Sequence, residues 1–77
     1  MNEWSTPQKP AEYAEYRLVE AILTGYFPIN STLPPERDLA EMLGVTRPTL
    51  REALQRLSRD GWLEIRHGKS TRVRDYW

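Results

Sequence analysis

Apolar side chains recur every three or four residues in a first stretch that begins near Pro10. This spacing places them on one face of an α-helix, which then packs that face against a core. Proline suits the first turn of a helix, and Gly25 is a suitable end. The pattern predicts a helix over about residues 10–25 with an apolar stripe of Leu18, Ile22 and Tyr26, flanked by Val19 and Leu23.

A turn-rich connector and a second, shorter helix follow. Residues 27–34 contain prolines and turn formers that cannot continue a helix, although Thr32-Leu33 is long enough to pair as a very short strand. Pro35 is suited to open a helix, and Gly44 is suited to end it after little more than two turns. Its predicted core face consists of Leu39, Met42 and Leu43.

After one intervening residue, the helical pattern starts again. Thr46 is a good N-cap for a third helix that runs to about Asp60, and Pro48 falls in the first turn, where a missing N–H costs nothing. Gly61 follows as the expected end of the helix. The predicted core face of this helix consists of Leu50, Ala53, Leu54 and Leu57.

Beyond Gly61 the pattern changes from helix to strand. Residues 62–66 and 71–74 alternate, and residues 67–70 supply turn chemistry between them, as in a β-hairpin. Two short helices joined through a glycine turn and followed by a hairpin indicate a winged helix-turn-helix. We therefore expect a mainly α fold, with three helices plus the hairpin as a wing, over residues 11–77, preceded by a flexible N-terminal arm over residues 1–10.

Composition excludes several classes of protein. The 77 residues suffice for one small domain, and the absence of cysteine excludes disulfides and thiolate metal sites. No apolar stretch reaches the ~18 residues of a membrane span, and the N-terminus lacks a signal-peptide layout, so we expect a cytoplasmic protein with no membrane partner. We also expect no enzymatic activity and no cofactor. The acids Glu36, Asp38 and Glu41 fall where a helix start favours them, and His67 is the only histidine.

The net charge of zero conceals a strong polarity along the chain. Residues 1–46 carry a net charge of −4, whereas residues 47–74 carry a net charge of +5. Affinity for DNA depends largely on neutralising phosphates, so the basic half could face a polyanion. Its basic residues are Arg47, Arg51, Arg56, Arg59, Arg66, Lys69, Arg72 and Arg74.

The third helix carries a polar stripe that suits the reading of bases. Arg47, Arg51 and Gln55 recur at four-residue intervals and share a face. A major groove accepts one helix, and the guanidinium fork of an arginine spans the two acceptors of guanine. Thr46 and Thr49 lie at the helix start, where N–H groups and hydroxyls hold phosphates. The alternative is an ordinary solvated helix face, and the two-helix layout with its hairpin favours DNA.

Three other sets of residues allow two interpretations each: Arg37, the hairpin tip and the strand arginines. Arg37 has Glu41 four residues away, and spacing alone favours an ion pair between them. At the hairpin tip, Gly68 can bring the backbone close to a partner and Lys69 can neutralise a phosphate, or the tip is merely a solvated turn. The strand arginines either steer the wing toward DNA or keep an edge strand soluble, and these are Arg66, Arg72 and Arg74.

Several segments together resemble the N-terminal DNA-binding domain of the GntR family of regulators. The resemblance covers about residues 11–76. It is carried by Leu33-Pro34-Pro35-Glu36-Arg37-Asp38-Leu39-Ala40, by Gly44-Val45-Thr46-Arg47-Pro48-Thr49-Leu50-Arg51-Glu52-Ala53-Leu54, and by Leu57 with Asp60-Gly61-Trp62-Leu63. Within the family, Gln55-Arg56-Leu57, Arg59-Asp60-Gly61-Trp62-Leu63 and His67-Gly68-Lys69 are similar to the acyl-CoA-responsive branch that regulates fatty-acid metabolism.

The resemblance implies a function and a set of contacts. It implies sequence-specific binding to double-stranded DNA at a pseudo-palindromic operator, with the helix at about residues 46–60 in the major groove and the wing at 62–74 in the minor groove. It also implies a homodimer in the full-length protein and an effector, such as a long-chain acyl-CoA, bound by a C-terminal domain that is absent from this chain. The implied DNA contacts are Arg37, Thr46, Arg47, Thr49, Arg51, His67, Gly68 and Lys69.

One departure and one competing function remain. Pro48 stands where the fatty-acid branch has threonine, so a hydroxyl and an N–H contact are lost and the operator is expected to differ somewhat. A winged-helix module that binds protein instead of DNA would show apolar residues on the exposed stripe. An enzyme would need a base, a nucleophile and an oxyanion donor together, and the sequence offers no such set.

Overall fold

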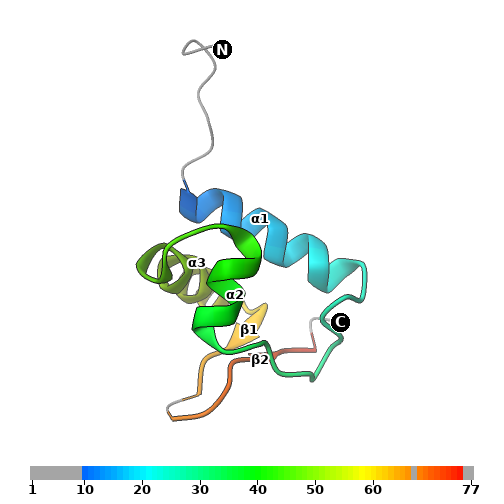
Figure 1. Ribbon diagram of the computed structural model, residues 1–77. Coiled ribbons are helices and arrows are strands. Elements are labelled where there is room, and N and C mark those ends of the chain that lie inside the picture. The colour runs from blue at the N-terminus through cyan, green and yellow to red at the C-terminus, as the bar shows by residue number, and fades with distance from the viewer. Residues whose placement is uncertain (1–9, 67, 76–77) are drawn as a thin grey trace.

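The computed structural model describes residues 10–66 and 68–75. Three helices, α1 (Pro10–Leu23), α2 (Glu36–Leu43) and α3 (Arg47–Arg59), precede an antiparallel hairpin of β1 (Leu63–Glu64) and β2 (Arg72–Val73). Figure 1 shows α1 running across the upper part of the molecule with α2 in front of it, and the hairpin beneath the helices. The expected fold class, three helices with a wing, is confirmed.

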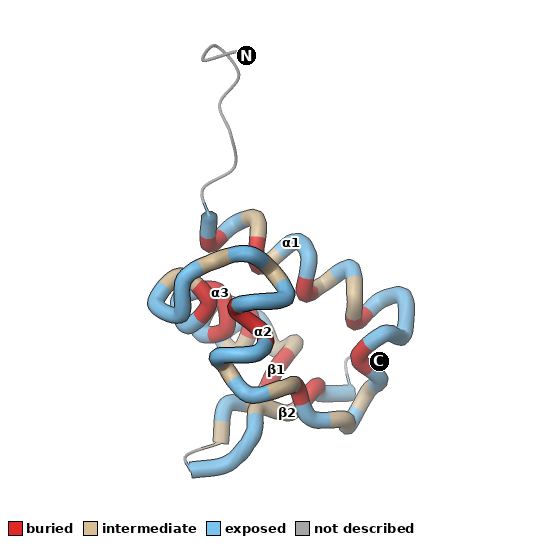
Figure 2. Tube along the Cα trace, in the orientation of Figure 1, coloured by how far each residue is buried: buried red, intermediate tan, exposed pale blue. Residues whose placement is uncertain are grey.

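Helix α3 is the element against which the others pack. It contacts α1, α2 and β1, because its apolar residues lie along one face. Leu50 is completely buried, and Ala53, Leu54 and Leu57 are buried beside it, as the spacing predicted. Figure 2 shows the buried segments of the helices and of the hairpin turned toward one interior. The main core thus lies between α1, α3 and the hairpin, with Leu39 and Ala40 of α2 closing one side.

Local backbone chemistry ends α3 and places the hairpin directly after it. Gly61 adopts the left-handed conformation (φ 93°), which a side chain would disfavour. The N–H of Gly61 donates to Ser58 O (3.2 Å) and the N–H of Trp62 donates to Leu57 O (2.9 Å), the paired bonds of a glycine-ended helix. Trp62 consequently packs against the core, and the chain enters β1 without a long connection.

The hairpin is shorter than its alternating sequence suggested. Among the residues described in the hairpin, only Leu63 and Glu64 pair in the strand ladder, with Val73 and Arg72 respectively, and Ile65 is 46% exposed. The predicted strand over residues 62–66 is therefore wrong beyond residue 64. The connector pairs with the outer side of β2, since Thr32 forms an isolated antiparallel bridge with Arg72. This agrees with the prediction that Thr32-Leu33 can pair as a very short strand.

Three residues predicted for the apolar faces are exposed instead. Leu23, the last residue of α1, is 58% exposed, and Tyr26, which follows the glycine at which the pattern stops, is 67% exposed. Met42 lies on the far edge of the α2 face and is 54% exposed, because Ala40 faces the core in its place. Phe27 and Leu33 from the connector belong to the buried core, which the helical patterns did not predict.

A three-membered ion cluster joins α1 to α3 at the margin of the core. Arg56 Nη1 lies 2.8 Å from Glu15 Oε2 of α1, and Arg56 Nη2 lies 2.6 Å from Glu52 Oε2 on its own helix. The hydrogen bond that Arg56 donates to Glu15 is the main cause that raises the pKa of the Arg56 guanidinium above its usual value. Arg56 therefore stays charged throughout the neutral range, and its own contribution to the cluster is lost as pH rises through that raised pKa.

The burial of Leu50 leads to a stability prediction. Leu50→Ala removes a completely buried side chain between the helices, which we expect to lower the free energy of unfolding by about 2–5 kcal/mol. Leu23→Ala is the matched control, because Leu23 is 58% exposed and its truncation should cost no more than about 0.5 kcal/mol. Urea denaturation followed by circular dichroism measures both values, and equal losses would contradict the placement of the core.

Candidate nucleic-acid interface

Helices α2 and α3 are joined by the short turn of a helix-turn-helix. Gly44 ends α2 in the left-handed conformation (φ 72°), and the N–H of Val45 then donates to Ala40 O (3.1 Å). Thr46 follows in an extended conformation as the N-cap of α3. The turn therefore fixes the start of α3 close to the body of α2 and leaves its first residues at the surface.

The predicted polar stripe of α3 is on the surface, beside the buried leucine face. The side chains of Arg47 and Arg51 are each 51% exposed, and Gln55 is exposed one turn further on. These arginines are not merely solvated, since both reach the carboxylate of Glu36 at the start of α2. Arg47 Nη2 lies 3.3 Å and Arg51 Nε lies 3.0 Å from the same oxygen, Glu36 Oε1.

Glu36 is a member of this site that sequence reasoning missed. The sequence predicted that Glu36 lies in the first turn of a helix, where acids are favoured, and this position is correct. The sequence did not predict the ion pairs that Glu36 forms with the arginines of α3. Its arginine partners lie 11 and 15 residues away, so no short-range spacing rule connects them. Only the angle at which α2 meets α3 brings the three side chains together.

The threonines at the start of α3 hold each other in place. Thr46 Oγ1 accepts a hydrogen bond from the N–H of Thr49 (3.3 Å), which is the capping contact that its position predicted. The Thr46 hydroxyl also donates to Thr49 Oγ1 (3.0 Å). Thr46 is exposed and Thr49 is half-buried, so at least one hydroxyl faces outward at the positive end of the helix.

Arg37 lies beside Glu36 and is exposed. The ion pair with Glu41 that spacing favoured is wrong, because no ion pair links these two described residues. An i, i+4 pair on a helix surface stabilises by only about 0.2–0.5 kcal/mol, so the spacing permits this pair without requiring it. Arg37 is therefore an exposed cation with no ion-pair partner among the described residues.

The wing tip lies across a cleft from the start of α2. This cleft has a volume of about 330 Å³, and Glu36, Gly68 and Lys69 all line it. Gly68 has a positive φ (70°), and both it and Lys69 are exposed. The turn is held from within, since Arg66 donates through Nε and Nη2 to Ser70 O (3.3 and 3.2 Å). His67, which was also predicted to contact DNA, lies outside the described residues.

The strand arginines have different environments. Arg72 lies 2.9 Å from Glu64 Oε1 and 3.3 Å from Asn30 Oδ1, so it ties the hairpin to the connector. Arg66 is likewise engaged within the wing, whereas Arg74 is exposed. Arg72 and Arg66 therefore have partners within the domain. Fewer of the basic residues at positions 47–74 are left to contact DNA than the net charge of that segment implied.

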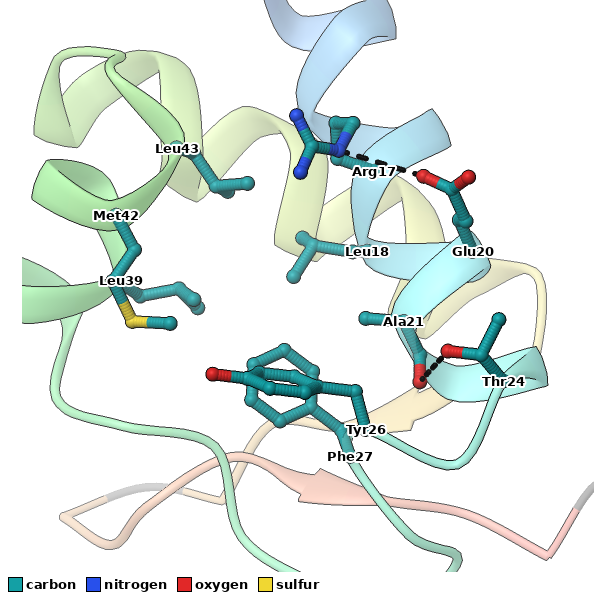
Figure 3. Close-up of a pocket in the computed structure, with 10 residues that line it drawn as sticks. All are labelled: Arg17, Leu18, Glu20, Ala21, Thr24, Tyr26, Phe27, Leu39, Met42 and Leu43. Carbon is teal, nitrogen blue, oxygen red and sulfur yellow. Dashed lines mark hydrogen bonds and ion pairs between the residues drawn. The ribbon is translucent and has the colours of Figure 1, made fainter.

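A second hollow lies between α1 and α2, away from the arginines. It has a volume of about 340 Å³, and Figure 3 shows Met42 and Leu43 of α2 on one side, Leu18 and Ala21 of α1 on the other, and Tyr26 below them. The only charged residues that line it, Arg17 and Glu20, face each other at 3.5 Å. In the described part of the chain no three acidic or histidine side chains gather as metal ligands would. None of the described helices is long and apolar enough to cross a membrane.

Known sequences share this combination of residues. Residues 10–73 match the family described as bacterial regulatory proteins, gntR family. The fatty acid metabolism regulator protein of Edwardsiella ictaluri is 60% identical over 70 residues, and that of Proteus mirabilis is 59% identical over 70 residues. Each alignment covers 91% of this chain but 29% of the relative, so the chain spans less than a third of these proteins.

Solved structures share the fold. The structure titled Streptococcus agalactiae GntR is 38% identical, with a TM-score of 0.76 over 84% of this chain and 32% of that one. AraR(DBD) in complex with operator ORX1 is 26% identical, with a TM-score of 0.80 over 95% of this chain and 86% of that one. AraR(DBD) in complex with operator ORE1 is 23% identical and has a TM-score of 0.86, a likeness of fold alone.

The capping contact of Thr46 leads to a prediction that separates its structural role from any contact with DNA. Thr46→Ala leaves the N–H of Thr49 without its acceptor, and we expect the free energy of unfolding to fall by about 0.5–2 kcal/mol. Thr46→Ser keeps a hydroxyl at the same place and should restore most of the loss. Thermal and urea denaturation in the absence of DNA measure both variants. An alanine variant as stable as the parent would show that the cap contributes nothing.

Proposed function

This chain belongs to the gntR family of bacterial regulatory proteins, and we propose that it binds double-stranded DNA sequence-specifically to regulate transcription. The observation that carries the proposal is the pair Arg47 and Arg51, exposed on α3 and held side by side next to the wing. Helix α3 would enter the major groove, where an arginine fork pairs with the two acceptors of guanine. The wing would lie at the minor groove.

The other predicted contacts support the same docking geometry. Thr46 and Thr49 at the start of α3 would hold a phosphate, and Arg37 lies where it can reach the same strand. Gly68 and Lys69, with His67 between β1 and β2, would meet the backbone beside the groove. The similar AraR structures contain operator DNA, which supports this use of the fold.

The target genes and the remaining partners are inferred from the relatives. Two relatives at about 60% identity are named fatty acid metabolism regulator proteins, so we infer that this chain serves genes of fatty-acid or related metabolism. We further infer that the full-length protein is a cytoplasmic homodimer on a pseudo-palindromic operator. Its effector, such as a long-chain acyl-CoA, would bind outside residues 11–77, and residues 1–10 would act as an arm. We propose neither catalysis nor a cofactor.

A protein-binding winged helix is the competing proposal. Protein interfaces favour aromatic and apolar residues at their centres. The exposed face of α3 instead presents Arg47, Arg51 and Gln55, and Glu36, which pairs with both arginines, shares a cleft with Gly68 and Lys69 of the wing. This chemistry suits a polyanion better than a protein.

Selection of bound sequences from a random DNA pool tests the proposal directly. The domain is fused to a dimeriser, because two tethered domains bind two half-sites far more tightly than one domain binds one. A palindromic motif is the expected result. Recovery of unenriched sequences would favour the protein-binding alternative.

The arginine pair should discriminate among sequences once that motif is known. Arg47→Ala or Arg51→Ala is expected to cost about 1–3 kcal/mol on the selected site and to relax the preference at one base pair. Arg59→Ala is the matched control, because Arg59 lies at the opposite end of the same helix and is exposed. Titrations by fluorescence anisotropy measure each affinity. Losses no larger than that of the control would refute the reading of bases by this pair.

Lys69 should act through charge alone. Lys69→Ala removes one phosphate-neutralising group, so we expect weaker binding to every duplex and a slope of log K against log salt that is shallower by about 0.9. Lys9→Ala, in the proposed arm, changes the net charge equally and serves as the comparison. A loss confined to the selected site would make Lys69 a reader of bases instead.

A further inference from the structure

We propose that Glu36 is the positioning residue that gives the arginine pair its sequence specificity. The inference rests on the proposed function and assigns to Glu36 a role distinct from that of the other acids on α2. Its carboxylate would keep Arg47 and Arg51 directed at bases and away from phosphates.

The geometry constrains two side chains that would otherwise move independently. Arg47 and Arg51 are one helical turn apart on α3, about 6 Å along the axis, and both are half exposed. Long exposed side chains lose much conformational freedom when they bind. Here both guanidinium groups already meet at one oxygen, Glu36 Oε1, at 3.3 and 3.0 Å. Part of the ordering that base recognition requires is thus complete before DNA arrives.

The charges act in the same direction. Two guanidinium groups that share one acceptor repel each other, and a carboxylate between them offsets one of the two charges. The trio therefore carries a net charge of +1 and attracts phosphate less strongly than a bare pair would. Attraction to phosphate is independent of sequence, so reducing it lowers non-specific binding more than it lowers base-specific binding.

Stability is not a sufficient reason for this arrangement. Exposed ion pairs contribute little to stability, because both partners remain largely solvated, and the two arginine side chains are each 51% exposed. The benefit of an acid at a helix start is shared by Asp38, which lies in the same first turn and contacts no arginine among the described residues. Glu36 and Asp38 lie in the same helical turn and carry the same charge, but of the two Glu36 is the one that forms ion pairs with Arg47 and Arg51.

That difference provides the matched experiment. Glu36→Gln and Asp38→Asn each remove one negative charge from the first turn of α2, so both should raise the affinity of the domain for a random duplex. Affinities for the selected site and for a random duplex of equal length are measured over a range of salt concentrations. Asp38→Asn should leave the ratio of the two affinities unchanged, whereas Glu36→Gln should lower it by about fivefold to tenfold, the size of one weakened arginine–guanine pair.

Signals of the arginine side chains provide a readout without DNA. In NMR spectra, the Arg51 Nε–H resonance should shift on Glu36→Gln and stay in place on Asp38→Asn, because only Glu36 accepts from that group. Equal thermal midpoints for the two variants confirm that both are folded. Equal specificity ratios in the two variants would overturn the inference and leave the proposed function standing. A parent domain that prefers no sequence would instead overturn the proposed function and the inference with it.

Discussion

The burial of one leucine face on α3 is the constraint on which the rest of the molecule depends. Helix α1, helix α2 and strand β1 all pack on this helix, so its rotation about its own axis is fixed by Leu50 and its neighbours. The stripe of Arg47 and Arg51 lies beside this buried face and outside it, where the helix is open to solvent. The exposure of Arg47 and Arg51 is therefore a consequence of the core, and no separate interaction is needed to turn them outward.

Features set by a few adjacent residues could be predicted from the sequence. The ends of α2 and α3 were correct because Gly44, Thr46 and Gly61 act through hydrogen bonds within one turn of the chain. The helical spacing of apolar residues gave a wrong prediction of burial where it was continued beyond a glycine that ends a helix. Tyr26 was placed on the stripe of α1, although the left-handed Gly25 ends that helix and redirects the chain before Tyr26 is reached.

The pairing of charges could not be predicted, since it depends on how helices are placed in space. Spacing favoured Arg37 with Glu41, two helix neighbours that form no pair among the described residues. Two other pairs do follow helical spacing, Arg17 with Glu20 and Arg56 with Glu52. The remaining pairs join separate elements, as Arg56 does with Glu15 across α1 and α3. Sequence reasoning therefore identified the arginines of the site correctly as exposed, and it missed the acid that organises them.

The ion pairs within the domain show how a protein with zero net charge can still present cations to DNA. Arg56 and Arg72 belong to ion pairs that hold elements together, and Arg66 donates to a carbonyl within the wing. The cations left for a polyanion are few and lie around α3 and the wing tip. A small number of phosphate contacts gives weak non-specific binding, while a held arginine pair can still pair with bases. Because specificity is the ratio of these two affinities, a neutral domain can discriminate well without binding DNA tightly everywhere.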